Sequence, residues 1–218
     1  MEVKTTFGAQ AVRFVQSSEL PEEKKVPLYR IIKAMQERYF FIQVPAKIDE
    51  IDFTKGVNFF GGLFEYKTID KFQVFQNGVV CEGKVGTDHC DRFIDDVLKF
   101  AGELGLPIAK QTAPDRAYFS SLEVYIDGDF SKATKLSPLQ SFMLEKFHSY
   151  GHTTPVYPVI GFKMGTDTTI ASVPIPGEFV FERRAGTAFS ESLYASWGPF
   201  RTEDHLALLV EIEKIMTS

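Results

Sequence analysis

Four residues that could do chemistry stand side by side at positions 88–91, in the order Asp, His, Cys, Asp. Histidine, cysteine and carboxylates are the side chains that hold zinc, and a cysteine activated by a nearby base is a common nucleophile. Apolar residues at helical spacing follow over 92–104, and Gly105 is placed to end a helix. The four residues therefore lie in the first turn of a predicted helix, whose N-cap is Thr87 or Asp88.

The start of a helix explains the same residues without catalysis. Acidic side chains such as Asp88 and Asp91 are favoured at the positive end of the helix dipole. His89 and Cys90 are adjacent, so their side chains point about 100° apart and cannot easily bind one ion together. Nothing in the sequence identifies the base and oxyanion donors that a nucleophilic Cys90 would need. We expect no metal site here, and we expect Cys81 and Cys90 to be free thiols.

A second candidate site is formed by Asp52 and, 13 residues later, a Glu-x-Lys motif made by Glu65 and Lys67. Over residues 26–125 this arrangement resembles the PD-(D/E)xK nucleases, whose core has the same order of helices and strands. The resemblance implies that Asp52 and Glu65 hold Mg²⁺ and that Lys67 positions the attacking water. No proline precedes Asp52, and "ExK" fixes only two letters. A metal-dependent nuclease acting on nucleic acid is thus the alternative hypothesis.

Three further residues are candidates for binding a partner. Arg183 and Arg184 form a local concentration of arginine, and alternation along a strand would send them to opposite faces. One of them could bind a phosphate or a partner's carboxylate, or simply pair with Glu182 across a sheet. Trp197 is the single tryptophan, and it could fill the core or anchor an interface.

Apolar periodicity indicates about four helices and a larger set of strands. The helices are expected from about Pro27, which suits a first helical position, and at roughly 88–104, 137–150 and 203–216. Ser137 and Thr202 are the expected N-caps, with Gln140 completing a capping box. The expected strands are 38–46, 56–66, 71–84, 117–127, 156–165, 177–186 and 191–198.

Glycine and proline mark particular features within these strands. Gly61-Gly62 indicates a bulge or a close backbone approach. The dipeptide Asn77-Gly78, with alternating residues on both sides, predicts a hairpin with a type I′ turn. Pro45 is expected to end the strand 38–46, and Pro158 favours an edge position for 156–165.

The two halves of the sequence repeat one pattern weakly. Each has strands followed by a helix that opens with Thr and contains an Asp-His pair, at 87–89 and at 202–205. If this reflects a duplication, His89 and His205 occupy equivalent positions, and a metal site shared by the two Asp-His pairs is conceivable. Incidental acidic residues at two helix starts are the simpler explanation.

Composition and charge restrict the class of protein. The 218 residues are 44% hydrophobic and include 21 Phe, enough for a substantial aromatic core. The net charge of −5 argues against binding nucleic acid through the whole surface. No run of 18 apolar residues and no signal-peptide pattern is present, so we expect a cytoplasmic protein that does not contact a membrane.

We therefore expect a single α+β domain over residues 1–218, with a mainly antiparallel, aromatic-rich sheet and about four helices. No nucleotide-binding, phosphate-binding or zinc-protease motif occurs. The leading hypothesis is a cytoplasmic binding protein, such as an inhibitor, an immunity-like protein or an assembly component. It would act on a protein partner through its surface, without a cofactor, whereas Mg²⁺ and nucleic acid belong only to the nuclease hypothesis.

Overall fold

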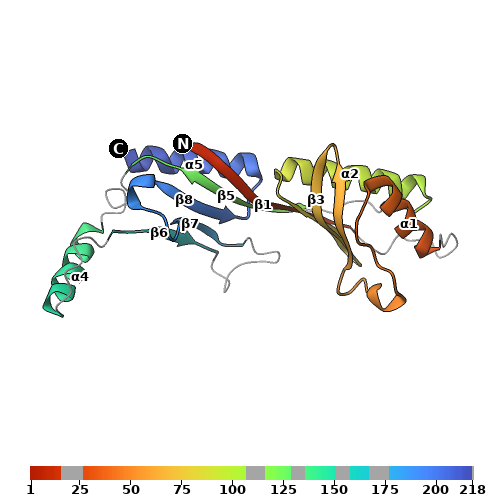
Figure 1. The fold of residues 1–218 in the computed structure, drawn as a ribbon, viewed down its shortest axis with the longest axis horizontal. Coiled ribbons are helices and arrows are strands. Elements are labelled where there is room, and N and C mark those ends of the chain that lie inside the picture. Colours follow the sequence, from red (N-terminus) through yellow and green to blue (C-terminus); the bar gives the residue numbers. More distant parts are fainter. Residues whose placement is uncertain (16–26, 107–115, 129–135, 151–157, 167–176, 218) are drawn as a thin grey trace. The chain divides into compact units, whose positions relative to one another are not determined.

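The chain forms one antiparallel sheet together with helices, as the computed structural model shows (Figure 1). The structure describes residues 1–15, 27–106, 116–128, 136–150, 158–166 and 177–217. The strands are β1 (Glu2–Phe14), β2 (Val57–Phe64), β3 (Lys67–Phe75), β4 (Gly78–Gly83), β5 (Arg116–Tyr125), β6 (Gly161–Met164), β7 (Phe179–Arg183) and β8 (Leu193–Gly198). The helices of this described part are α1 (Leu28–Tyr39), α2 (Thr87–Glu103), α4 (Ser137–Ser149) and α5 (Thr202–Thr217), with short 3₁₀ turns at Ile48–Glu50 and Phe189–Glu191. The predicted α+β fold with an antiparallel, aromatic-rich sheet is confirmed.

The order of the elements repeats. The strands lie in the order β2-β3-β4-β1-β5-β8-β7-β6, so β1 and β5 are central and each is followed outwards by three strands of its own half. Along the chain, the described elements of both halves follow the order strand, helix, three strands, helix. β6 is at the edge of the sheet, as Pro158 predicted. The weak repeat in the sequence thus corresponds to a repeat in topology.

Contacts divide the chain into two compact units. The N-terminal unit comprises residues 6–120 and 199–202, and the C-terminal unit comprises residues 1–5, 121–198 and 203–218. β1 and β5 each contribute residues to both units.

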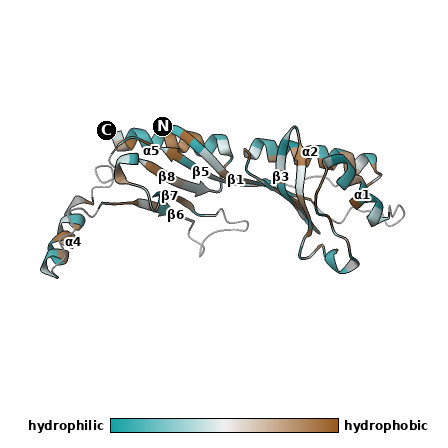
Figure 2. Cartoon of the chain, in the orientation of Figure 1, coloured by the Kyte–Doolittle hydropathy of each residue, from teal (hydrophilic) through white to brown (hydrophobic). Residues whose placement is uncertain are grey.

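In the N-terminal unit, α1 and α2 pack on the same face of the sheet. Apolar residues recur along both helices at a spacing that makes one continuous stripe, and the hydropathy of α2 alternates accordingly (Figure 2). The stripes meet in an aromatic cluster around Tyr39, whose ring centroid lies 5.1 Å from that of Phe93 and 6.5 Å from that of Phe64. Phe93 is fully buried. Truncation of such a core ring to alanine costs about 3–5 kcal/mol.

In the C-terminal unit, α5 buries Leu209, Ile212 and Met216. Strands β7 and β8 supply aromatic residues, and the rings of Phe181 and Tyr194 stack with their centroids 4.7 Å apart. None of the described helices is both long and apolar enough to cross a membrane.

The predicted strand over residues 38–46 is wrong. Helix α1 continues to Tyr39, Phe40 adopts a left-handed conformation, and only Gln43 forms an isolated bridge, with Phe60. Tyr39 is needed in the helix because its ring joins the aromatic cluster, and its hydroxyl donates a hydrogen bond to Asp96 Oδ2 at 2.7 Å. Tertiary packing therefore decides the end of this helix.

The irregularity predicted at Gly61-Gly62 is present. Gly61 is skipped in the pairing of β2 with β3, and its φ is +66°. A Cβ on Gly62 would lie 2.5 Å from Cε1 of Phe41, which lies against the strand at this point. Glycine is therefore required by the close approach of Phe41.

The hairpin between β3 and β4 is present, but its turn differs from the prediction. Phe75 pairs with Gly78, so Gln76 and Asn77 form the loop, and neither has a positive φ. Two consecutive positive φ angles occur instead in the loop between β2 and β3, at Glu65 (46°) and Tyr66 (62°).

The residues predicted as N-caps lie inside the helices instead of before them. Helix α2 begins at Thr87 with Gly86 as its N-cap, α4 begins at Ser137 with Leu136 as its N-cap, and α5 begins at Thr202. Neither Gly86 nor Leu136 offers a side-chain cap. At α2 the hydroxyl comes from elsewhere, because the Thr87 N–H donates to Thr202 Oγ1 at 3.0 Å.

Candidate binding surface

The three residues of the nuclease hypothesis do not meet. Asp52 precedes β2, whereas Glu65 and Lys67 lie in the loop and strand that follow it. The eight residues of β2 span roughly 25 Å at about 3.3 Å per residue. The N–H of Gln76, at the far end of β3, bonds the carbonyl of Phe53 beside Asp52, which places that residue away from the Glu65 turn. Asp52 and Glu65 therefore cannot bind one metal ion, and this part of the prediction is corrected.

Asp52 has a local role instead. Its Oδ1 accepts hydrogen bonds from the hydroxyl and the N–H of Thr54, and its Oδ2 lies 3.2 Å from Lys55 Nζ. These partners, the Thr54 hydroxyl first, lower the pKa of Asp52 to about 2. Asp52 thus stabilises a tight turn.

Glu65 belongs to a polar cluster at the start of α2. Arg92 Nη2 lies 3.1 Å from Glu65 Oε2, and Arg92 Nη1 lies 2.9 Å from Asp88 Oδ2. Arg92 Nη2 also lies 3.2 Å from His89 Nδ1. Because an arginine can only donate, Nδ1 accepts and the ring proton sits on Nε2, which is buried without a hydrogen-bond partner. Both carboxylates are thus paired with the one guanidinium of Arg92.

His89 is a neutral core residue. Its side chain is 1% exposed and its ring lies 5.4 Å from that of Phe64. Burial first, and the nearby cations Lys67 and Arg92 next, lower the pKa of His89. His205 lies in the other unit, and among the described residues no group of three or more His, Cys, Asp or Glu side chains could hold a metal ion.

Cys81 and Cys90 are free thiols, and both are fully buried between β4 and α2. Burial, and then a hydrogen bond with Cys90, raises the pKa of the Cys81 thiol. A raised pKa and the lack of exposure make a thiol a poor nucleophile. These cysteines are part of the core.

Asp91 also forms an ion pair and a hydrogen bond within the fold. Its Oδ1 lies 3.0 Å from Nη2 of Arg13, a side chain only 1% exposed, and its Oδ2 accepts a hydrogen bond of 2.6 Å from the Tyr118 hydroxyl. Asp95 lies 3.0 Å from Arg13 Nη1. Removing one partner of a buried ion pair leaves an uncompensated charge and costs about 3–5 kcal/mol. This network ties α2 to β1 and β5.

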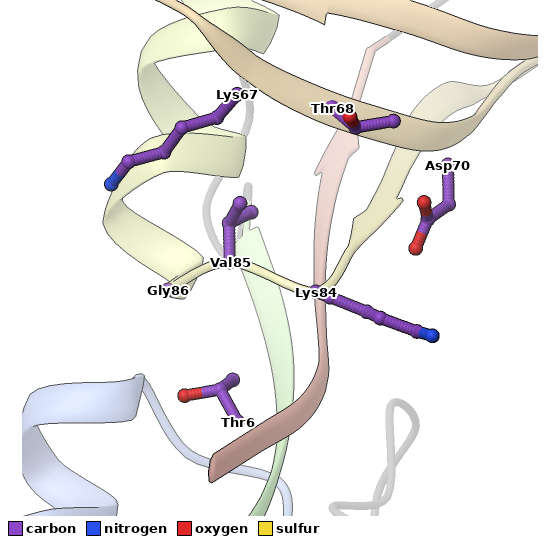
Figure 3. A pocket seen from close by; sticks show the side chains of 7 residues that line it. All are labelled: Thr6, Lys67, Thr68, Asp70, Lys84, Val85 and Gly86. Atoms are coloured by element: carbon purple, nitrogen blue, oxygen red, sulfur yellow. The ribbon is translucent and has the colours of Figure 1, made fainter.

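A polar pocket of about 600 Å³ lies beside the start of α2. It is lined by Thr6, Lys67, Thr68, Asp70, Lys84, Val85 and Gly86 (Figure 3). The ammonium groups of Lys67 and Lys84 point to opposite sides, and Lys84 extends on the side of Asp70. The first N–H of α2 donates a hydrogen bond to the Thr202 hydroxyl. The cations therefore do not converge on one anion.

Arg183 and Arg184 both contact the chain itself. Arg183 donates to the carbonyl of Ala188 at 3.0 Å, and its guanidinium lies 4.3 Å from the ring centroid of Phe189. Arg184 Nε lies 3.1 Å from Glu123 Oε1, and the Glu123 side chain is only 7% exposed. Both arginines hold strands and loops together, and their role in binding a partner stays a prediction.

Trp197 lies in β8, where it pairs with Val180 of β7. Its side chain is half-buried, which fits neither a fully buried core residue nor an exposed anchor. Its role at an interface stays a prediction as well.

The surface with the clearest potential for binding is the face of the N-terminal unit that α1 and α2 do not cover, called here the open face. Pairing aligns its side chains in three rows across β2, β3, β4 and β1. The rows are Phe60-Lys71-Glu82-Gln10, Asn58-Gln73-Val80-Val12 and Phe75-Gly78-Phe14. Every side chain in the rows is half-buried.

Several polar groups in the first two rows bond one another. Gln10 donates to Glu82 at 2.8 Å, and Gln73 donates to Asn58 at 2.7 Å. Lys71 Nζ lies 5.9 Å from the ring centroid of Phe60, within the range of a cation–π interaction. The open face is thus preorganised, and its one lysine and one glutamate give no net charge.

No protein-family model matches this chain, and no curated protein matches it.

Proposed function

We propose that the protein is a cytoplasmic binding protein that engages a protein partner through the open face. The observation that carries the proposal is the set of three cross-strand rows, in which half-buried phenylalanines flank side chains that are hydrogen-bonded to one another. Aromatic anchors surrounded by polar groups are characteristic of the centre of protein interfaces. Each of the amide side chains in the rows already has a hydrogen-bond partner on the face, which lowers the cost of covering it.

The charge of the open face favours protein over nucleic acid as the partner. Nucleic-acid binding draws on clustered lysine and arginine that neutralise phosphates. In the rows Lys71 is balanced by Glu82, with which it pairs across the strands. The whole chain is acidic as well, with a net charge of −5. A neutral aromatic surface suits a partner with a complementary aromatic and polar patch.

Site-specific photocrosslinking tests the proposal. p-Benzoylphenylalanine is placed at position 60 on the open face or, as a matched control, at position 29, where Tyr29 is 65% exposed on α1. Illumination in an extract of the source cells should give a discrete protein adduct from position 60 alone, which an excess of the unlabelled chain suppresses. Equal adducts from both positions, or no protein adduct from position 60, would refute the open face as the binding surface.

A further inference from the structure

Charged side chains from two parts of the fold surround the ring of His89. Asp88 and Arg92 belong to α2, Glu65 lies in the turn between β2 and β3, and Lys67 begins β3. These four groups are two carboxylates and two cations, so their charges cancel while the imidazole is neutral. A proton on His89 therefore adds one uncompensated positive charge to the cluster.

Neutral His89 holds Arg92 in place. Its Nδ1 accepts a hydrogen bond from Arg92 Nη2 at 3.2 Å. The same Nη2 lies 3.1 Å from Glu65 Oε2, which is itself 3.6 Å from Nδ1. One guanidinium nitrogen thus bridges the ring and the carboxylate. Glu65 cannot bond Nδ1 in this state, because a carboxylate accepts hydrogen bonds and the unprotonated Nδ1 has none to donate.

A proton on Nδ1 reverses the preference for these two neighbours. A protonated imidazole donates from both ring nitrogens. Nδ1–H and the N–H of Arg92 would then be two donors on two cations facing each other at 3.2 Å. Glu65 Oε2 is an acceptor of opposite charge and is already within 3.6 Å of Nδ1. Charge and hydrogen-bonding capacity therefore both favour Glu65 over Arg92 as the partner of a protonated His89.

The difference in burial decides which side chains move. The side chain of His89 is only 1% exposed and is packed against Phe64, whereas those of Glu65 and Arg92 are 50% and 49% exposed. Exposed side chains change rotamer freely, and a packed ring does not. Arg92 also keeps a second partner, since its Nη1 lies 2.9 Å from Asp88 Oδ2. The guanidinium can therefore leave the ring without losing its ion pair within α2.

We infer that acid exchanges the partners at this contact: in the folded protein a proton from solvent binds Nδ1 of His89, the Arg92 guanidinium leaves the ring, and the Glu65 carboxylate accepts the new Nδ1–H. Glu65 and Tyr66 form the turn between β2 and β3, so the exchange changes how this hairpin is tied to α2. Burial first, and the cations Lys67 and Arg92 next, lower the pKa of His89 below its ordinary value of 6.5, which places the exchange on the acid side of that value. The contact is separate from the open face.

Long-range ¹H–¹⁵N NMR spectra of the imidazole rings test the inference. At pH 7 the Nδ1 of His89 should be unprotonated, and on titration to about pH 4 it should gain a proton while the chain stays folded. The backbone amide signals of Glu65 and Tyr66 should shift with the same midpoint as His89. His205 titrates in the same spectra and is the internal control, because it lies in the other unit.

Two variants with opposite expected effects separate partner exchange from burial alone. Glu65→Gln removes the carboxylate that receives Nδ1–H and should lower the midpoint of His89 by about 1 pH unit. Arg92→Gln removes a cation but keeps a side-chain donor, and it should raise the midpoint by about as much. Both variants should leave the midpoint of His205 unchanged.

Several results would overturn the inference. A protonated Nδ1 at pH 7 contradicts the bond from Arg92, and a His89 midpoint that neither variant moves shows that burial alone sets it. Amide signals of Glu65 and Tyr66 that do not follow His89 show that the turn takes no part. A wild type that unfolds before His89 gains its proton has no such exchange in the folded state.

Discussion

The buried imidazole of His205 couples the stability of the protein to pH. His205 is fully buried, and its Nε2 lies 2.8 Å from the hydroxyl of Ser196. The Ser196 hydroxyl in turn donates to the carbonyl of Val180 at 2.9 Å, so it accepts from Nε2–H of His205. Burial lowers the pKa of His205 to about 4, from the ordinary value of 6.5.

Replacing His205 should therefore reduce the loss of folding stability at acid pH. The unfolded chain takes up a proton below pH 6.5, whereas the folded chain resists protonation of His205 until about pH 4. Stability from this group is thus complete above pH 6.5 and is lost as the pH falls towards 4, by about 3 kcal/mol in total. Urea unfolding at pH 7 and pH 4.5 should show a smaller loss for His205→Leu than for the wild type. Ser196→Ala keeps the histidine and should keep the loss; an unchanged pH dependence in His205→Leu would contradict the assignment.

At the scale of single residues, the sequence indicated which side chains are chemically conspicuous but not what they contact. Asp88 and His89 were correctly attributed to a helix start, yet their link to Glu65 depends on a turn whose two positive φ angles fall on Glu65 and Tyr66. Such angles cost non-glycine residues energy, and Asn77-Gly78 was the better local candidate. The pairing of β2 with β3 overrides that local preference.

Between elements, two helix starts satisfy each other. The Thr87 N–H donates to Thr202 Oγ1 at 3.0 Å, and the Thr202 N–H donates to Thr87 Oγ1 at 2.9 Å. The first N–H groups of a helix have no partner inside it, so each hydroxyl caps the other helix. The two residues are far apart in sequence, which is why a local search for N-caps failed here.

Loss of either hydroxyl should destabilise the protein measurably. Thr87→Val and Thr202→Val keep the side-chain shape but leave one buried or half-buried N–H without its acceptor, at a cost of about 1 kcal/mol each. Thr217→Val is the control, because the Thr217 hydroxyl bonds only the carbonyls of Glu213 and Lys214 in its own helix. Free energies of unfolding from urea titrations give the comparison. Losses no larger than that of the control would show that the reciprocal bonds contribute little.

The elements themselves were largely predictable, because apolar periodicity is a property of the local sequence. The helices α2, α4 and α5 begin and end within about two residues of the predicted ranges. The open face was not predictable in the same way. Its rows exist only once the register is known: Lys71 meets Glu82 because the loop is Gln76-Asn77, and a loop at Asn77-Gly78 would have shifted each pair.

For the whole molecule, the repeated order of strands and helices is the main result that the sequence hinted at but could not establish. The matching elements have little identity beyond a few positions such as Tyr39 and Tyr150, because an apolar core constrains size and spacing more than residue type. What relates the halves is the order of their strands about β1 and β5. Part of β1 and part of β5 belong to each of the two units.

Shared strands should make the two units unfold together, as the single domain predicted from the sequence requires. If one unit unfolded alone, β1 and β5 would have to break partway along, and the remaining unit would lose the ends of two central strands. Trp197 fluorescence reports on the C-terminal unit, and the reactivity of the buried thiols Cys81 and Cys90 reports on the N-terminal unit. In a urea titration both signals should change with the same midpoint. Thiols that become reactive at a urea concentration where Trp197 is still native would instead divide the chain into two domains, despite the continuous strands.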